Sequence, residues 1–335
     1  MPLKIAINGF GRIGRCVSRL ICEHLDVQLV AINDLNSTTM MQYLLENDSV
    51  HGQFLHSVEL MSENCLKIGS QEVHVIHESN PQKVDFASLG ADVVIECSGM
   101  FLTQKEAQHH IEKGIKRVIF SAPAADDETA TFVIGVNEHL YSGQKIISNA
   151  SCTTNCLGHV AKILDDNFGI DKGLVTTIHA YTNDQNLLDA THKSDPRRSR
   201  AAAVNMIPTY TGAAKAMKLV LPSLDGKLHG QSVRVPTPDV SMVDFNVVIN
   251  KNTTKEELSE LFTDESQNRL KNIIEVDKKM RVSQDFVNSP MSAIIADDLT
   301  QVIDGNLVKI MAWYDNEWGY SNRLIEMALH IVNEE

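Results

Sequence analysis

The first half of the chain alternates short apolar runs with helical patterns of apolar residues. Residues 3–8 form a compact apolar run, and Ile13, Val17, Leu20 and Ile21 then recur at the spacing of one helix face. The further runs with the length of buried strands are 27–32, 91–97, 116–120 and 145–147, with a helical pattern at 103–113. Strands that alternate with helices in this way are typical of an α/β domain with a parallel sheet.

The second half has longer alternating runs and fewer helical patterns. The runs that predict strands are 173–179, 231–235, 240–249 and 307–314, and the helical patterns lie near 212–219 and 254–263. We therefore expect an α+β domain whose largely antiparallel sheet carries its helices on one face. The segment 181–203 lacks periodicity, and a loop of that length is usually functional or part of an interface.

A length of 335 residues exceeds what one hydrophobic core usually supports, which favours two domains. We place the first domain at residues 1–151 and the second at 152–318. The last stretch, 319–335, is amphipathic and is expected to pack as a helix on the first domain.

A glycine-rich turn follows the first strand and opens the first helix. The turn reads Gly9-Phe10-Gly11-Arg12-Ile13-Gly14. The second strand ends at Asp34, twenty residues past the last glycine. A strand, this glycine spacing, a helix and a distant acid together form the dinucleotide-binding fingerprint of the Rossmann fold.

Each residue of this fingerprint has a physical role. Gly9 would permit the tight turn, Gly11 would let a pyrophosphate approach, and Gly14 would allow close packing of helix and strand. The N-terminus of the helix, at Arg12 and Ile13, would bind the phosphates. Asp34 would accept hydrogen bonds from the adenosine ribose and repel a 2′-phosphate, which favours NAD over NADP.

Two serines follow later strands of the same half. Ser98 and Ser121 come directly after the runs 91–97 and 116–120. Ligands of open α/β sheets bind at the carboxyl ends of the strands, so both serines are candidates for the edge of the cofactor site. The alternative is that they cap helices.

One cysteine lies where a strand, a polar turn and a helix meet. Cys152 follows the run 145–147 and precedes an apolar helical pattern that begins at Cys156. A thiol in the first turn of a helix lies near unpaired N–H groups and the positive end of the dipole, which favour thiolate. We interpret Cys152 as a nucleophile for an electrophilic carbon, with a small buried core residue as the alternative.

Composition and charge narrow the class of protein. A net charge of −13 is unfavourable for a nucleic-acid-binding surface. The local basic cluster suits a small anion better than a polymer, with a solvated loop as the alternative; it comprises His192, Lys193, Arg197, Arg198 and Arg200. No apolar run is long enough for a membrane span, and the start of the chain lacks a signal-peptide pattern, so we expect a cytoplasmic protein. Six cysteines without CxxC pairs indicate reduced thiols, and we predict no metal site.

Six blocks of sequence together resemble phosphorylating glyceraldehyde-3-phosphate dehydrogenases. They follow the order of that family and extend over nearly the whole chain, at residues 7–15, 148–156, 179–185, 211–216, 234–238 and 313–320. The resemblance implies that Cys152 attacks the aldehyde of glyceraldehyde 3-phosphate to give a hemithioacetal. His179 would accept the hydroxyl proton as hydride leaves for the nicotinamide, and its imidazolium would hold Cys152 as thiolate. Inorganic phosphate would then attack the thioester and release 1,3-bisphosphoglycerate.

The resemblance also implies two anion sites and two further cofactor contacts. Thr182 and Arg234 match the substrate-phosphate contacts of the family, and hydroxyl and arginine donors suit a tetrahedral oxyanion. The residues that match the inorganic-phosphate contacts are Ser151, Thr153, Thr211, Gly212 and Arg198. Asn316 matches the residue that binds the nicotinamide carboxamide, and Tyr320 is a further cofactor candidate. A tetrameric family implies a homotetramer, with segment 181–203 at a subunit interface.

Some positions depart from the pattern of the family. Three residues, 194–196, stand between His-Lys and Arg-Arg where the family often has two, which leaves Arg197 as the alternative to Arg198. Residues 189–191 lack the usual Leu-Pro pair and resemble NADP-accepting relatives. Because the carboxylate of Asp34 opposes a phosphate dianion, we still expect preference for NAD with residual use of NADP. Cys156 is either a redox partner of Cys152 or a packing residue.

Two other functions remain as alternatives. Erythrose-4-phosphate dehydrogenase shares the fold, the cysteine and the histidine, but hydrolyses its thioester and needs no inorganic-phosphate site. The motifs of aspartate-semialdehyde dehydrogenase are absent. A binding or adhesion protein with a vestigial site is the alternative outside enzymes, and retention of both Cys152 and His179 argues against it.

Overall fold

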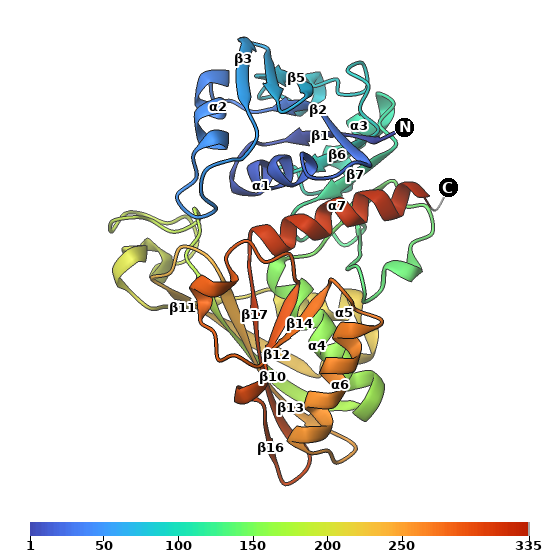
Figure 1. Cartoon of the computed structure of the whole chain (residues 1–335), viewed down its shortest axis with the longest axis vertical. Helices are drawn as coiled ribbons and strands as arrows, with labels where there is room; N and C mark the ends of the chain where they lie inside the picture. The colour runs from blue at the N-terminus through green and yellow to red at the C-terminus, as the bar shows by residue number, and fades with distance from the viewer. Residues whose placement is uncertain (334–335) are drawn as a thin grey trace. The chain divides into compact units, whose positions relative to one another are not determined.

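The computed structural model describes residues 1–333, which form two compact units (Figure 1). The first unit comprises residues 1–134, 138–150 and 321–333. The second unit comprises residues 135–137 and 151–320. Helix α7 (Trp318–Asn333) begins in the second unit and continues in the first.

The first unit is built on a nine-stranded sheet of order β3-β4-β5-β2-β1-β6-β7-β9-β8. The strands are β1 (Leu3–Asn8), β2 (Val27–Asn33), β3 (Val58–Ser62), β4 (Cys65–Ile68), β5 (Gln71–Ile76), β6 (Val93–Glu96), β7 (Arg117–Phe120), β8 (Ala130–Thr131) and β9 (Ile146–Ser148). Its helices are α1 (Arg12–Ile21), α2 (Thr38–Glu46) and α3 (Gln104–Glu112). Every pairing from β5 to β8 is parallel. The predicted α/β domain is confirmed.

Strand burial explains which elements the sequence pattern revealed. Each residue of β6 and β7 is buried, as expected for central strands of a sheet covered on both faces. In β3 only Val58 is buried, so this edge strand lacks an apolar run. The hairpins of β3, β4 and β5, and helix α2, were accordingly not among the expected elements.

The second unit holds an eight-stranded mixed sheet of order β11-β12-β10-β13-β17-β15-β14, with β16 paired to β17. The strands are β10 (Ile170–Ala180), β11 (Ile207–Tyr210), β12 (Leu228–Val235), β13 (Ser241–Ile249), β14 (Ile274–Asp277), β15 (Ala293–Ala296), β16 (Gln301–Ile303) and β17 (Leu307–Tyr314). Only β10–β12 and β14–β15 are parallel among the described pairs. The predicted α+β domain with a largely antiparallel sheet is therefore confirmed.

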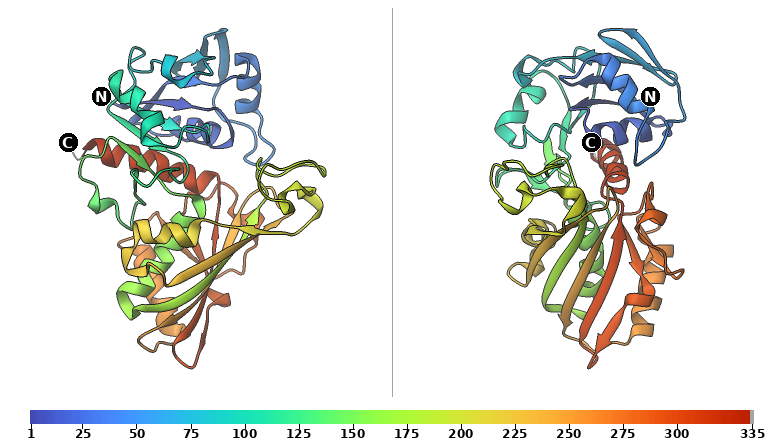
Figure 2. Two further views of the ribbon diagram at one scale, coloured as in Figure 1. Left: turned by 180° about the vertical axis from the view of Figure 1, so that it is seen from behind. Right: turned by 90° about the vertical axis from the view of Figure 1, so that its left-hand side faces the viewer.

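Three helices accompany this second sheet: α4 (Cys152–Phe168), α5 (Ala213–Val220) and α6 (Lys255–Gln267). Helix α4 contacts β13 and β17 in the middle of the sheet, α5 contacts β12, and α6 lies beside β14 (Figure 2). Segment 181–203 is an irregular loop whose only helical pieces are short 3-10 turns near its end. Its exposed apolar side chains include Leu187 and Leu188.

The register of the second sheet brings together residues far apart in the sequence. His179 on β10 pairs with Arg234 on β12, and Ser241 on β13 pairs with Tyr314 on β17. These four side chains therefore come from the ends of strands in one sheet. Within residues 1–333, none of the helices combines the length and the apolar character needed to span a bilayer.

Candidate active site

Cys152 is the first residue of helix α4. Ser151 precedes it as the N-cap, with extended backbone, and its hydroxyl accepts a hydrogen bond from the N–H of Thr154 at 3.1 Å. Cys156, one turn further on, is fully buried, which agrees with a packing role. The local sequence thus places the Cys152 thiol at the N-terminal end of a capped, well-buried helix.

The Cys152 thiol faces the imidazole of His179. Cys152 Sγ lies 3.7 Å from His179 Nε2, within reach for a hydrogen bond to sulfur. His179 Nδ1 lies 2.7 Å from the carbonyl oxygen of Ala180 and 3.2 Å from Arg234 Nη1. The carbonyl oxygen can only accept and makes the shorter contact, so we assign the proton to Nδ1, which leaves the lone pair of Nε2 facing the thiol. The histidine is therefore arranged as a base toward Cys152.

The surroundings of this pair shift the pKa values of both groups. Burial raises the pKa of the Cys152 thiol, although the charge of Arg234 and the hydrogen bonds of Thr153 act in the opposite direction. Burial, and then the charge of Arg234, lower the pKa of His179 to about 3. Both shifts act against the expected thiolate and imidazolium, and desolvation is the largest cause of each.

Arg234 and Thr182 lie together next to His179. Arg234 Nη1 donates to the Thr182 hydroxyl at 3.2 Å and to the Ala180 carbonyl at 3.0 Å. The guanidinium is largely buried, and burial lowers its pKa from an ordinary value far above neutrality, so it stays charged. The two residues predicted to bind the substrate phosphate thus form one cationic group with a hydroxyl.

The residues predicted for the second anion site differ in the hydrogen bonds that they already make to other protein groups. Thr153 Oγ1 lies 2.9 Å from the hydroxyl of Tyr314, which in turn lies 2.8 Å from Thr177 Oγ1. The Thr211 hydroxyl accepts from the N–H of Ala213, and Gly212 is the N-cap of α5. Tyr314 was not singled out from the sequence, although it belongs to the quoted block 313–320.

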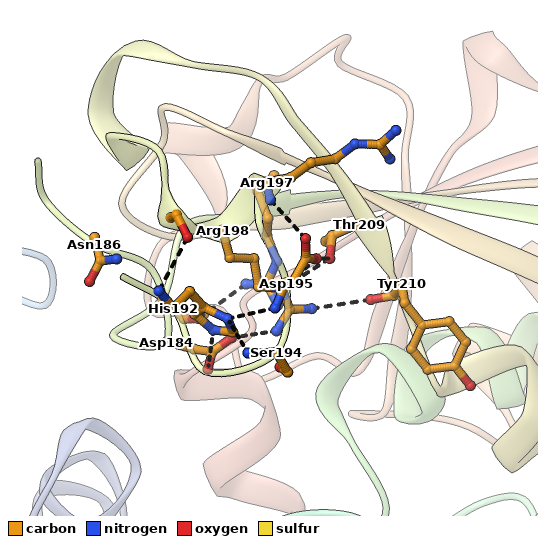
Figure 3. A network of polar contacts seen from close by, with 12 residues as sticks. Asp184, Asn186, His192, Ser194, Asp195, Arg197, Arg198, Thr209 and Tyr210 are labelled. Atoms are coloured by element: carbon orange, nitrogen blue, oxygen red, sulfur yellow. Dashed lines mark hydrogen bonds and ion pairs between the residues drawn. The ribbon is translucent and has the colours of Figure 1, made fainter. Parts of the chain in front are cut away.

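Arg198 belongs to a polar network of the long loop (Figure 3). Its Nε donates to Thr209 Oγ1 at 2.9 Å, and its Nη1 is paired with Asp184. The side chain of Arg197 points away from this network in Figure 3. Burial is the largest cause of the lowered pKa of His179 and of Arg234, and the charge of Arg198 adds to both shifts, which indicates that Arg198 lies near them. These observations favour Arg198 over Arg197 as the phosphate ligand.

Asn316 lies between β17 and α7 and is 6 % exposed. Its Oδ1 accepts a hydrogen bond from the hydroxyl of Ser241 at 2.6 Å. Tyr320, one turn further along, is 5 % exposed. Ser241 carried no role in the sequence-based prediction.

The glycine-rich loop of the first unit has the backbone that dinucleotide binding requires. Gly9 has φ +98°, and a Cβ there would come within 2.5 Å of the N atom of Ser98. A Cβ on Gly14 would lie 2.2 Å from the carbonyl oxygen of Gly9, so helix α1 can approach the loop only with glycine there. A Cβ on Gly11 would meet no protein atom within 4 Å, which leaves room for a phosphate at the start of α1.

The charged residues near this loop are held in place. Asp34 Oδ2 accepts from the N–H of Phe10 at 2.7 Å, so the acid is tied to the glycine-rich loop. Arg12 forms a two-point ion pair with Asp48. Burial raises the pKa of Asp48, but the hydrogen bonds from Arg12 and two backbone N–H groups outweigh it and hold that pKa well below its usual value. The Arg12 side chain is therefore structural, while its backbone opens α1. The loop, the helix start and the acid together fit a bound NAD.

Ser98 and Ser121 do not cap helices. Thr103 caps α3 instead, and the Ser98 hydroxyl donates to the buried carboxylate of Glu96 at 2.5 Å. Glu96 also accepts from Asn8 Nδ2 at 2.5 Å, which ties the carboxyl ends of β1 and β6 together. Burial raises the pKa of Glu96 to about 7. The sequence-based prediction missed Glu96 because nothing local marks a buried acid at a strand end.

A pair of buried carboxyl groups lies in the second unit, at Asp239 and Asp315. The two residues are 2 % and 1 % exposed, and their carboxylate oxygens lie within 4.8 Å of one another. Burial, and then the negative charge of Asp315, raise the pKa of Asp239 to about 9. Asp239 is therefore protonated at neutral pH.

We expect Asp239→Asn to stabilise the protein, with a gap in Tm over the wild type that widens from pH 5 to pH 9. The folded wild type keeps a proton on Asp239 that the unfolded chain loses above about pH 4. The free energy of unfolding of the wild type therefore falls as pH rises from the unfolded pKa toward the raised folded pKa. Asparagine is always neutral and places an NH₂ donor where the protonated carboxyl group lies. Thermal unfolding at constant ionic strength measures the gap. A gap that stays constant or narrows with pH would contradict the raised pKa.

Comparison with known proteins gives consistent matches over the chain. The family model described as "Glyceraldehyde 3-phosphate dehydrogenase, NAD binding domain" matches residues 3–104, and that described as "Glyceraldehyde 3-phosphate dehydrogenase, C-terminal domain" matches residues 151–316. Glyceraldehyde-3-phosphate dehydrogenase of Helicobacter pylori is 48 % identical over 97 % of this chain and 98 % of its own. Glyceraldehyde-3-phosphate dehydrogenase 1 of Bacillus subtilis is 46 % identical over 100 % of this chain and 99 % of its own. Glyceraldehyde-3-phosphate dehydrogenase of Geobacillus stearothermophilus is 45 % identical over 100 % of this chain and 99 % of its own.

Proposed function

This chain belongs to the glyceraldehyde-3-phosphate dehydrogenase family, and we propose that it carries out the phosphorylating reaction through a thioester on Cys152. It is an NAD-dependent oxidoreductase of glycolysis. The proposed reaction converts glyceraldehyde 3-phosphate, NAD and inorganic phosphate into 1,3-bisphosphoglycerate and NADH. The observation that carries it is the contact of 3.7 Å between Cys152 Sγ and the unprotonated Nε2 of His179.

Cys152 and His179 would act as nucleophile and base. Transfer of the thiol proton to His179 Nε2 gives the thiolate, which adds to the aldehyde carbon of the substrate. His179 returns this proton to the alkoxide that forms, which gives the hemithioacetal hydroxyl. The neutral Nε2 then takes the hydroxyl proton as the C–H hydride leaves, and the carbon becomes a thioester. NAD, when bound, supplies the hydride acceptor. Attack of phosphate on the thioester breaks the C–S bond, releases the acyl phosphate and regenerates the Cys152 sulfur.

Two groups of donors would orient the phosphates. We assign the C3 phosphate of the substrate to Arg234 and Thr182, which are already joined by a hydrogen bond of 3.2 Å. We assign the attacking phosphate to Arg198 and to the hydroxyl and backbone donors of the remaining predicted contacts, namely Ser151, Thr153, Thr211 and Gly212. The proposed cofactor contacts of the second unit are Asn316 and Tyr320. The proposed cofactor contacts of the first unit are Gly9, Gly11, Arg12, Ile13, Gly14, Asp34, Ser98 and Ser121.

The test is the formation of NADH from glyceraldehyde 3-phosphate and NAD, with and without inorganic phosphate. We expect absorbance at the NADH wavelength to rise steadily only with phosphate, because the thioester otherwise holds Cys152 blocked. Turnover that does not depend on phosphate, with a preference for erythrose 4-phosphate, would favour a hydrolysing enzyme. The absence of any turnover would favour a non-enzymatic role.

Replacing Asp34 by glycine should shift the cofactor preference toward NADP. A carboxylate facing a phosphate dianion disfavours NADP by a few kcal/mol at about 4 Å and moderate dielectric, and the substitution removes that repulsion. We expect the ratio of kcat/KM for NADP to that for NAD to rise by about tenfold or more. Initial rates with each cofactor measure it. An unchanged ratio would refute the ribose assignment of Asp34.

We further propose that the protein is a homotetramer in the cytoplasm. The exposed leucines Leu187 and Leu188 of segment 181–203, at 78 % and 76 %, are side chains that an interface would cover. The cysteines of the described chain are free thiols, as a reducing compartment requires. A monomeric mass at micromolar concentration, measured by light scattering, would contradict the tetramer.

A further inference from the structure

The amide of Asn316 is held in one orientation by Ser241. Asn316 Oδ1 accepts from the Ser241 hydroxyl at 2.6 Å, and this is the only hydrogen bond of the Asn316 side chain within residues 1–333. A primary amide has one oxygen acceptor and an NH₂ group with two donors. Since Ser241 takes the oxygen, Asn316 offers its NH₂ group to whatever ligand it meets.

Ser241 links a backbone donor to the Asn316 side chain. The Ser241 hydroxyl lies 3.0 Å from the N–H of Ala180, and a backbone N–H can only donate, so the serine oxygen accepts this bond. The nearest atom of Asn316 is Oδ1, which can only accept, so the single hydroxyl proton of Ser241 goes to Asn316. Ser241 is 1 % exposed, so solvent does not compete for either bond.

The chain before Ser241 is held in an unusual conformation. Val240 has φ +64°, a value that β-branched residues rarely adopt, and is 3 % exposed. Ser241 then opens β13, paired with Tyr314 on β17. The backbone thus aims the Ser241 side chain at the segment that carries Asn316, and the surrounding structure keeps it there.

We propose that Ser241 is a positioning residue that makes Asn316 a donor, so that Asn316 recognises the carbonyl oxygen of the nicotinamide carboxamide. This inference rests on the proposed function, which assigns the carboxamide to Asn316. The same serine accepts from the backbone N–H of Ala180, and the carbonyl of this residue lies 2.7 Å from His179 Nδ1. Cofactor recognition and orientation of the base thus share one hydroxyl.

The test is Ser241→Ala in the full-length enzyme. Without the hydroxyl the Asn316 amide can rotate. We expect KM for NAD to rise about tenfold and kcat to fall, because the loss of one well-placed hydrogen bond has about this effect. KM for glyceraldehyde 3-phosphate should stay unchanged. Ser241→Thr keeps the hydroxyl and should restore KM for NAD. An unchanged KM for NAD in Ser241→Ala would overturn the proposal.

Ser232→Ala is the matched control. Ser232 lies on β12 of the same sheet, is 2 % exposed, and has no hydrogen-bond partner for its hydroxyl within the described chain. This variant removes a buried hydroxyl without breaking a bond, and KM for NAD should remain that of the wild type. An equal rise in Ser232→Ala and Ser241→Ala would show general loosening of the sheet and overturn the proposal.

A cofactor analogue distinguishes positioning from a structural effect. 3-Acetylpyridine adenine dinucleotide keeps the carbonyl acceptor of the carboxamide but lacks its NH₂ group. In Ser241→Ala the rotated Asn316 can still bind the NH₂ of NAD through oxygen, but it cannot bind the analogue that way. The ratio of dissociation constants, analogue to NAD, should therefore rise by on the order of threefold over the wild type. An unchanged ratio would overturn the proposal.

Binding is measured by the quenching of tryptophan fluorescence, so this result does not depend on turnover. A wild type that binds both cofactors but lacks phosphate-dependent turnover would contradict the proposed function alone. The binding ratio would still decide the role of Ser241.

Discussion

Cys152→Ser should lower kcat for glyceraldehyde 3-phosphate oxidation by at least about 10⁴-fold, because a serine hydroxyl is a far weaker nucleophile than a thiolate. The substitution changes one atom of the first residue of α4, and the capping bond from Ser151 to the N–H of Thr154 does not involve it. We therefore expect NAD to bind with wild-type affinity. Initial rates of NADH formation and fluorescence titration with NAD measure the two quantities.

Cys156→Ala is the control for this substitution. Cys156 lies on the same helix and is fully buried, and the proposed reaction assigns it no step. We expect this variant to keep kcat close to the wild type, with some loss of thermal stability from the small cavity. More than about 1 % of wild-type kcat in Cys152→Ser would rule out covalent catalysis by this residue.

His179→Gln should lower kcat by about 10² to 10⁴-fold, the range expected for loss of a general base. The structure gives the reason: Nδ1 is committed to the Ala180 carbonyl, and only Nε2 faces Cys152 Sγ. Glutamine keeps polar atoms in this position but cannot accept and carry a proton in the reaction. KM for NAD should remain unchanged, because the side chain belongs to the proton-transfer step.

The dependence of activity on pH gives a second measurement for the same residue. With a pKa of about 3, His179 stays neutral over the working range, so it does not cause loss of activity between pH 5 and pH 7. The Cys152 thiol has a raised pKa, and its ionised fraction therefore grows with pH throughout the neutral range. We expect kcat/KM of the wild type to rise from pH 6 to pH 9.

Addition of imidazole to His179→Gly should restore part of the rate that this variant loses. If the rate is not restored and kcat/KM of the wild type does not rise with pH, His179 is excluded as the base.

Features encoded by short stretches of sequence could be predicted from it. The strand, turn and helix around Cys152 and the glycine-rich turn at Gly9 each involve neighbours in the chain, so local patterns reveal them. The helix start at Cys152 and the left-handed φ of Gly9 follow from such patterns. Arg198 was already the preferred candidate, and its bonds to Thr209 and Asp184 now give a physical reason for preferring it.

Features that depend on distant pairings could not be predicted in this way. Ser241 and Asn316 are 75 positions apart, and Thr153 and Tyr314 are 161 positions apart. Their contacts follow from the register of β13 with β17, which no local pattern specifies. The effect of burial on the pKa values of Cys152 and His179 could not be predicted from local sequence either, since desolvation depends on the whole surrounding fold.

The pairing of His179 with Arg234 across β10 and β12 sets limits on engineering. Successive side chains of a strand point to opposite faces, so one residue inserted in β12 ahead of Arg234 would turn its guanidinium away from the imidazole. The loop 181–203 between these strands already carries an extra residue relative to the common family pattern without disturbing this pairing. A change of length is therefore tolerated better in that loop than in the two strands, provided that Thr182 and Arg198 keep their places.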